Sequence, residues 1–267
     1  MSVELKDVAK SFIDREGNQL EVLKDLSFFV APGEIVTLIG PSGCGKTTTL
    51  RIIAGLVRHD MGEVLIDGKE VQKPGQDRGF VFQDYGLMPW LSVRQNIEFG
   101  LAVTNAPKEE RRQTSNRLLK IIGMERFPDF YPHELSGGMQ QRVGLARALA
   151  IDPKILLMDE PLASLDAQTR IYMRKEVLRL VEEMKKTVVY VTHDLEEAIS
   201  MSQRILVLEG GGGIPSKIAD DVHIHVKGRR SDYVHATDAI PNYGEIKTRI
   251  WNILRKYVEQ QMEAGKL

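Results

Sequence analysis

Apolar side chains recur at two different spacings along this chain, and the changes of spacing predict the order of its elements. Residues 3–12 and 20–30 carry apolar side chains at alternating positions and flank a turn-rich stretch at 14–18, which predicts an antiparallel pair of strands. Residues 62–68 predict a further hairpin. Short, uninterrupted apolar runs are typical of buried strands, and these lie at 34–39, 79–82, 155–160, 187–192 and 204–208.

Helical spacing predominates between the runs at 79–82 and 155–160. An apolar and aromatic loop at 85–91 is followed by helices expected at 93–103, 108–122 and 138–150. We expect these helices to form a helical subdomain, about residues 86–153, inserted into an α/β core. Other helices are expected at 48–54, 167–184 and 245–259.

Composition narrows the class of protein without identifying it. The 267 residues suit one large α/β domain with a subdomain, and a formal net charge of −1 gives no indication of a nucleic-acid partner. One cysteine excludes an intrachain disulfide and fits a reducing compartment. No apolar run reaches the roughly 18 residues of a membrane span, and the N-terminus lacks the apolar core of a signal peptide. Any membrane role is therefore expected to come through a partner.

A glycine-rich stretch joins the strand expected at 34–39 to the helix expected at 48–54. It fits the pattern G-x-x-x-x-G-K-[ST], in which backbone N–H groups turn inward around an anion at the positive end of a helix. Lys46 would supply a mobile positive charge for the β- and γ-phosphates of a nucleotide. A chance match is disfavoured by the strand before the stretch and the helix after it. The nucleotide-binding residues expected here are Gly40, Pro41, Ser42, Gly43, Cys44, Gly45, Lys46, Thr47 and Thr48.

Polar side chains at the ends of three later strands indicate metal and catalytic chemistry. Thr47 and Asp159 are placed to hold Mg²⁺, and Gln83 could touch the ion or a water beside the γ-phosphate. Glu160 can take a proton from an attacking water, and His193 can contact the γ-phosphate and orient that water. Each side chain has a plainer interpretation, since an isolated glutamine is usually a surface residue and an isolated histidine is usually structural.

A second anion site is indicated inside the helical region. Ser136 is a good N-cap, and Gly137 and Gly138 expose backbone N–H groups at the start of a helix. This site has no lysine. One chain would not usually need two such sites for a single nucleotide.

Three further features are open to more than one interpretation. Phe12, near the end of the first strand, is either a platform on which adenine stacks or an ordinary core residue, and periodicity alone favours the core residue. His223 and His225 share one face of a strand, but no third metal ligand is evident, so an exposed strand face is the simpler interpretation. The four glycines at 210–213 suggest a flexible break.

Several of these motifs occur together in an order and spacing that resemble the ATP-binding subunit of ABC transporters. They are the phosphate-binding stretch, Gln83, Leu-Ser-Gly-Gly-Met-Gln-Gln-Arg at 135–142, Leu-Leu-Met-Asp-Glu at 156–160 and His193. The resemblance covers about residues 1–209, which we expect to form the ATPase domain, with 210–267 as a small C-terminal extension. Residues 88–93 and 165–170 are similar to the nitrate, sulfonate, taurine and bicarbonate importers, although Ser164 stands where that group is expected to have alanine or glycine.

The resemblance implies a fold, a mechanism and partners. The fold is α/β, a phosphate-loop (RecA-like) ATPase core with an antiparallel β subdomain and an inserted helical subdomain. Two copies would pack head to tail, so that each ATP, with Mg²⁺, lies between the Lys46 loop of one chain and residues 136–138 of the other. Gln140 would also contact nucleotide, Phe12 would stack on adenine, and Asp166 would couple the two sites.

The same resemblance implies a place at a membrane. The loop from Gln83 to about Trp90 would seat a helix of a membrane permease. A periplasmic or lipid-anchored substrate-binding protein would act indirectly, and the chain would be peripheral on the cytoplasmic face of the cell membrane.

Three rival functions remain open from the sequence. One is a soluble ABC ATPase of nucleic-acid repair or translation, although the chain has neither a long coiled coil nor tandem ATPase units. Another is the ATP-binding subunit of an exporter. The last is a nucleotide switch without hydrolysis, which the presence of both Glu160 and His193 disfavours.

Overall fold

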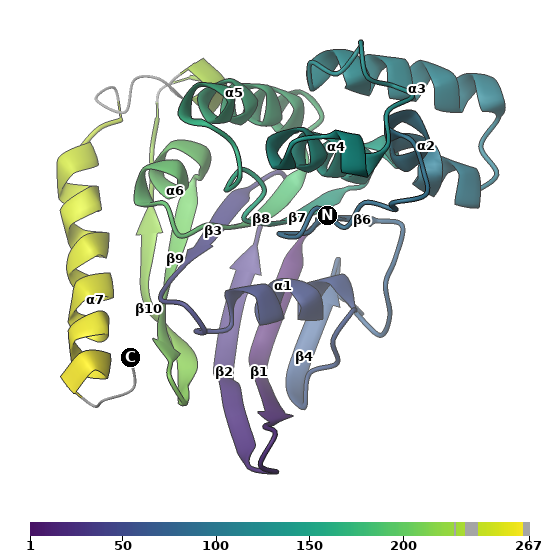
Figure 1. Ribbon diagram of the computed structural model, residues 1–267. Coiled ribbons are helices and arrows are strands. Elements are labelled where there is room, and N and C mark those ends of the chain that lie inside the picture. The colour runs from purple at the N-terminus through teal and green to yellow at the C-terminus, as the bar shows by residue number, and fades with distance from the viewer. Residues whose placement is uncertain (227, 233–239, 264–267) are drawn as a thin grey trace.

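The computed structural model describes residues 1–226, 228–232 and 240–263, and its centre is one mixed sheet. Within the described residues the sheet has ten strands in the order β5-β4-β1-β2-β10-β9-β3-β8-β7-β6 (Figure 1). Their bounds are β1 Val3–Ile13, β2 Gln19–Val30, β3 Ile35–Ile39, β4 Met61–Ile66, β5 Lys69–Glu70, β6 Arg78–Val81, β7 Ile155–Asp159, β8 Thr187–Val191, β9 Arg204–Gly211 and β10 Ile214–His223.

The parallel half of the sheet explains the uninterrupted apolar runs. Strands β6, β7, β8, β3 and β9 pair in parallel, and every residue of β3, β7 and β8 is buried. Alternate side chains enter different cores: Leu156 and Met158 pack with the helical region, whereas Ile155 and Leu157 pack with α1 (Lys46–Ala54). Because both faces are covered, the strands need apolar residues at every position.

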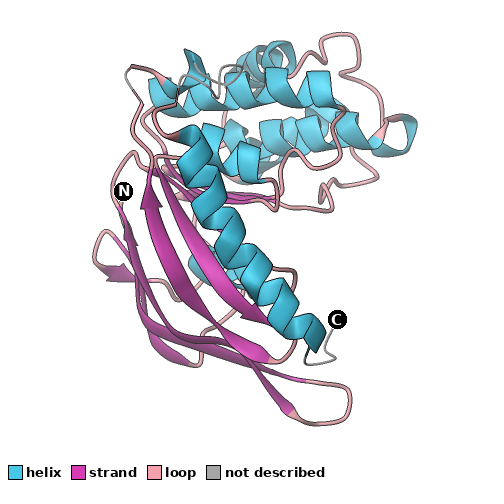
Figure 2. Ribbon diagram, turned by 90° about the vertical axis from the view of Figure 1, so that its left-hand side faces the viewer, coloured by secondary structure: helices cyan, strands magenta, loops and turns pink. Residues whose placement is uncertain are grey.

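The antiparallel half is the predicted β subdomain. Strands β1 and β2 pair along their whole length, and β1 also pairs with β4. In Figure 2 these strands form a long curved sheet whose far end extends away from the helices. The two halves are joined where Ser216 of β10 pairs in parallel with Leu23 of β2.

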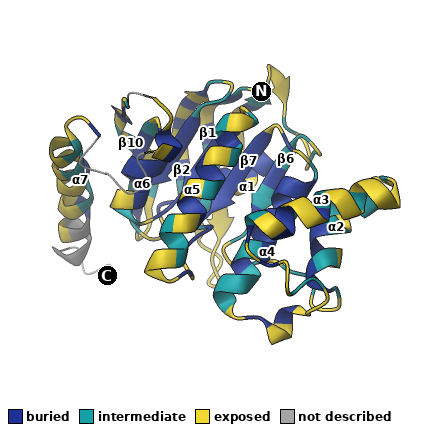
Figure 3. Ribbon diagram, turned by 90° about the horizontal axis from the view of Figure 1, so that it is seen from above, coloured by how far each residue is buried: buried dark blue, intermediate teal, exposed yellow. Residues whose placement is uncertain are grey.

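Helices α2 (Val93–Val103), α3 (Lys108–Ile121) and α4 (Gly137–Ala150) lie between β6 and β7 in the chain and pack on one another. Figure 3 shows α3 outermost, with an exposed outer face, and buried strands beneath the helices. A capping box formed by Ser92 and Gln95 starts α2, and the 3₁₀ helix η1 (Pro132–Glu134) precedes α4. The predicted α/β architecture, with an antiparallel β part and an inserted helical part, is confirmed.

The glycines interpreted as a flexible break are part of the sheet. Gly210 and Gly211 end β9, and Gly212 and Gly213, with φ of 58° and 88°, form the two-residue turn of the β9–β10 hairpin. A Cβ on Gly211 would lie 2.9 Å from the carbonyl oxygen of Ser42, so the turn packs directly on the phosphate-binding stretch. The sheet therefore runs across residue 209, and the predicted domain boundary there stays a prediction.

Residues after β10 pack against the helices that follow β7 and β8. Helix α5 spans Ala167–Glu183 and α6 spans Leu195–Met201. In the 3₁₀ helix η2 (Arg230–Asp232), Ser231 donates to Glu182 of α5 at 2.7 Å. Helix α7 (Tyr243–Glu263) packs on α6 and β9, and lies alongside the sheet in Figures 1 and 2. No described helix combines the length and the apolar character needed to span a membrane.

Candidate functional site

The phosphate-binding stretch, Gly40–Thr47, forms a tight loop that follows β3 and runs into the first turn of α1. We call it the phosphate loop. Gly43 and Gly45 have φ of 76° and 89°, a conformation that disfavours side chains with a Cβ, and Gly45 is the N-cap of α1. A Cβ on Gly40 would lie 2.6 Å from the carbonyl oxygen of Leu208 and 2.7 Å from Cys44 Sγ. The glycines are therefore required by backbone conformation and by close packing.

Lys46 lies at the centre of the phosphate loop. Its Nζ donates to the carbonyl oxygens of Gly40 and Pro41, both at 2.7 Å, and the side chain is buried. Cys44 is fully buried beside it, and this burial raises the pKa of the Cys44 thiol. Only the backbone of Cys44 can therefore contact a ligand in the loop. Ser42 and Gly43 are exposed at the tip.

Thr47 and Asp159 meet at the edge where β3 and β7 end. The Thr47 hydroxyl donates to Asp159 Oδ1 at 3.0 Å, and burial raises the pKa of Asp159. A hydroxyl, a carboxylate and phosphate oxygens are hard ligands of the kind Mg²⁺ selects. One hydroxyl and one carboxylate suit an ion that takes few protein ligands and keeps phosphates and waters, as Mg²⁺ does.

Glu160 lies between Gln83 and His193. His193 Nδ1 is 3.1 Å from Glu160 Oε2, and Gln83 Nε2 donates to the same oxygen at 3.5 Å. Glu160 has φ of 47°, a left-handed conformation that is uncommon outside glycine and occurs often at functional sites. Its backbone N–H is held by the Val191 carbonyl at 3.0 Å. The ends of β6, β7 and β8 thus bring together three of the predicted catalytic side chains, whereas the fourth, Lys46, lies in the phosphate loop.

The turn Leu135–Gly138, which we call the signature turn, starts α4 as expected. Ser136 is exposed and is the N-cap, accepting a hydrogen bond from the Met139 N–H at 3.3 Å. A Cβ on Gly137 would lie 2.7 Å from Tyr85 Oη, so the turn is packed against the loop that follows Gln83. Gln140 turns its side-chain amide inward and donates to the carbonyl oxygens of Pro132 and Leu135.

The remaining candidates lie in separate places. Asp166 is the exposed N-cap of α5, and hydrogen bonds from Thr169 lower the pKa of Asp166. Phe12 is 40% exposed near the end of β1, so it is not an ordinary core residue. No interaction found among the described residues joins either side chain to the Glu160 cluster.

Sequence reasoning missed Gln141. Its side-chain amide donates to the Glu160 carbonyl at 2.9 Å, and its Oε1 accepts from the Ser164 N–H at 3.0 Å and from the Ser164 hydroxyl. It therefore joins α4 to the backbone of Glu160. The available signal was its position, because Gln141 falls on the buried face of α4 with Gly144, Leu145 and Ala148.

Comparison with known proteins gives consistent matches. A family model described as ABC transporter matches residues 23–163. The nitrate import ATP-binding protein NrtD of Synechocystis sp. is 38% identical over 99% of this chain and 99% of its own length. The aliphatic sulfonates import ATP-binding protein SsuB of Bacillus cereus is 38% identical over 100% of this chain and 98% of its own length.

A solved structure is similar as well. It is a dimeric structure of a post-hydrolysis state of the ATP-binding cassette MJ0796, bound to ADP and Pi. It superposes with a TM-score of 0.75 at 36% sequence identity, and the match covers 83% of this chain and 98% of that one.

Proposed function

This chain belongs to the ABC transporter family, as an ATP-binding subunit with ATPase activity, and from that premise we propose that it powers the import of a small anion. The observation that carries the proposal is the cluster at the ends of β6, β7 and β8, where Gln83, Glu160 and His193 meet next to Asp159 and the phosphate loop. Such a cluster suits attack of water on a γ-phosphate.

Each side chain would have one task in hydrolysis. The phosphate loop and Lys46 would hold the β- and γ-phosphates, and Thr47, Asp159 and Gln83 would hold Mg²⁺, which supplies positive charge against the transferring phosphoryl group. Glu160 would accept a proton from the attacking water. His193, 3.1 Å from Glu160, would orient that water and contact the γ-phosphate. This assignment is supported by the geometry around Glu160.

The second anion site supports a mechanism with two copies of the chain. Ser136, Gly137 and Gly138 present a helix N-terminus whose contacts are with Tyr85 and Leu165 rather than with the chain's own phosphate loop. In a head-to-tail dimer these residues would face the nucleotide held by the partner chain, with Gln140 nearby. Asp166, exposed at the start of α5, would lie near the dimer interface.

A surface next to the catalytic cluster suits a membrane permease. Trp90 is 71% exposed in the loop that begins after Gln83. The loop is held from below by Asn96, which is fully buried, accepts from the Met88 N–H and donates to the Leu91 carbonyl. A large aromatic side chain that is exposed on an ordered loop is typical of a surface that binds another protein. The chain would then sit peripherally at the cytoplasmic face of the cell membrane.

The substrate class is proposed from the relatives. The nitrate and aliphatic sulfonate importers described above suggest nitrate or a sulfonate as cargo, and the sequence resemblance adds taurine and bicarbonate. A substrate-binding protein outside the membrane would deliver the anion to the permease, and this chain would not touch it.

The test is to purify the chain from its native membrane with its bound partners and reconstitute the complex in vesicles. The proposal expects a permease to co-purify, and ATP hydrolysis to rise when a binding protein loaded with one of these anions is added. A Lys46→Ala variant should lose nucleotide binding and uptake together. Hydrolysis by the wild type that no permease influences, combined with salt-sensitive binding to nucleic acid, would instead support the repair or translation function.

A further inference from the structure

Phe12 lies at an irregular point of the antiparallel sheet. Pairing of β1 with β4 ends at Ala9 opposite Met61, and the β1–β2 register shifts between Lys10 and Ser11. The segment that carries the exposed Phe12 ring is therefore not fixed by β4. A ring that served as a binding platform would need another support there.

Asp60, the residue immediately before β4, provides that support. Its Oδ2 accepts from the Ser11 N–H at 2.7 Å, and its Oδ1 accepts from Lys10 Nζ at 2.7 Å. Its own N–H donates to the Ala9 carbonyl at 2.9 Å. One carboxylate thus holds the backbone of Ser11 and the side chain of Lys10, the two residues that precede Phe12.

Lys10 in turn covers part of Phe12. Its Nζ lies over the aromatic ring, 5.2 Å from the ring centroid, within the range of a cation–π interaction. The Lys10 side chain is only 14% exposed, whereas Phe12 is 40% exposed. The ammonium group lies over the ring, and 40% of the Phe12 residue stays exposed.

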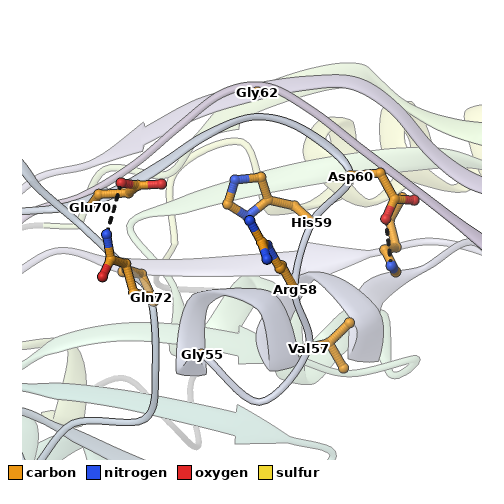
Figure 4. Close-up of a pocket in the computed structure, with 10 residues that line it drawn as sticks. Gly55, Val57, Arg58, His59, Asp60, Gly62, Glu70 and Gln72 are labelled. Atoms are coloured by element: carbon orange, nitrogen blue, oxygen red, sulfur yellow. Dashed lines mark hydrogen bonds and ion pairs between the residues drawn. The ribbon is translucent and has the colours of Figure 1, made fainter.

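The ion pair between Lys10 and Asp60 is expected to contribute little to the stability of the fold. The ion pair lies at the edge of an open groove of about 930 Å³, which Arg58, His59 and Glu70 also line (Figure 4). The hydrogen bond from Lys10 lowers the pKa of Asp60, but the Asp60 side chain is 44% exposed. Ion pairs so open to solvent usually stabilise a protein by about 1 kcal/mol or less.

We propose that Lys10 and Asp60 are positioning residues for a nucleotide base, because together they hold the exposed Phe12 ring with an ammonium group over it. The inference rests on the proposed function. Asp60 holds the backbone of Ser11 in place, Lys10 holds the orientation of the Phe12 ring, and the ring stacks on the adenine of ATP.

The test separates the base from the phosphates. Tripolyphosphate carries the anionic groups of ATP and has no base, so it reports on the phosphate loop alone. In Lys10→Met and Asp60→Ala, the dissociation constant of ATP should rise about two- to fivefold, the size of a cation–π contribution. The dissociation constant of tripolyphosphate should stay at the wild-type value. Both are measured by calorimetry on the full chain.

Two further variants make the result specific. Glu63→Gln removes the other lysine–carboxylate pair between these strands, Lys6–Glu63 at 3.9 Å, and should change neither dissociation constant. In a Phe12→Ala background, which itself should bind ATP more weakly, Asp60→Ala should have no further effect on ATP. Asp60→Asn, which keeps an acceptor for the Ser11 N–H, should fall between the wild type and Asp60→Ala.

The outcomes distinguish this inference from the proposed function. The positioning role would be overturned if the Lys10 or Asp60 variants bound ATP and tripolyphosphate more weakly by the same factor. It would also be overturned if Asp60→Ala or Phe12→Ala bound ATP as tightly as the wild type. Either result would leave the ATPase assignment in place. A wild-type chain that binds neither compound would overturn the proposed function, and this inference with it.

Discussion

The adjacent carboxylates Asp159 and Glu160 lie beside different side chains. Asp159 and Glu160 are adjacent, yet Asp159 accepts from Thr47 below the phosphate loop while Glu160 faces Gln83 and His193. In a regular strand the two side chains would simply point to opposite faces. The left-handed φ of Glu160, whose N–H donates to the Val191 carbonyl, ends the strand there. The carboxylate that we propose to bind metal and the one that we propose to accept a proton therefore have different neighbours.

Replacing Glu160 by glutamine should stop turnover without preventing ATP binding. The amide keeps the size of the side chain but cannot accept the proton of the attacking water, so turnover should fall by about 10²- to 10⁴-fold. ATP binding, measured by calorimetry, should remain close to the wild-type value. Wild-type turnover in this variant would remove Glu160 from the role of base.

At the scale of elements, α4 links the two anion sites within one chain. Its N-terminus forms the signature turn, and one turn further on Gln141 reaches the Glu160 carbonyl. Arg147, near its other end, donates to the Gly86 carbonyl at 2.5 Å and so holds the loop after Gln83. A displacement of this helix would therefore change the position of the Glu160 backbone and of the loop that carries Trp90.

Gln141→Leu tests the link from α4 to Glu160. The change keeps the approximate volume but leaves the Ser164 N–H without its acceptor, so the free energy of unfolding should fall by about 1–3 kcal/mol. Turnover should fall more than ATP affinity, because the Glu160 backbone loses a support while the phosphate loop does not. Urea unfolding and steady-state kinetics measure the two effects. Gln113→Leu, on the exposed face of α3, is the control and should leave both at the wild-type value.

Elements with local signals were predictable, and long-range contacts were not. The expected helix at 93–103 matches α2, since Ser92 and Gln95 mark its start in the sequence itself. Gln83, Glu160 and His193 were predicted as catalytic residues because each stands at the end of an apolar run, and the structure places them together. The role of the four glycines at 210–213 was missed, because a turn and a flexible break have the same composition. Lys10 and Asp60 gave no signal, since their partnership depends on strand pairing across 50 residues.

At the scale of the whole molecule, the position of Trp90 predicts a coupling surface. Trp90→Ala should reduce permease co-purification and uptake. It should leave ATP affinity nearly unchanged, because Trp90 lies outside the phosphate loop and the Glu160 cluster. Trp251→Ala is a matched control, since Trp251 is 56% exposed on α7, which packs on β9 and α6. Loss of nucleotide binding with intact permease binding in Trp90→Ala, or equal effects of the two variants on uptake, would contradict the coupling surface.

The head-to-tail arrangement of two chains can be tested by cross-linking across the nucleotide. Cys44 is a poor probe because it is fully buried, but Ser42 in the phosphate loop and Ser136 in the signature turn are both exposed. In a Cys44→Ala background, a chain that carries both Ser42→Cys and Ser136→Cys should form a covalent dimer with a short bis-maleimide linker. The Glu160→Gln change and Mg-ATP keep the dimer closed during the reaction.

A denaturing gel gives the readout, and the two single-cysteine chains are the controls. In a head-to-tail dimer, like residues lie at opposite sites, so neither single variant should give the product that the double variant gives. Mixing the two single variants should restore it, because each closed site then joins Ser42→Cys of one chain to Ser136→Cys of the other. A covalent dimer formed equally by either single variant, or none formed by the mixture, would mean that the two anion sites do not face each other across chains, and hydrolysis would then have to be explained within one chain.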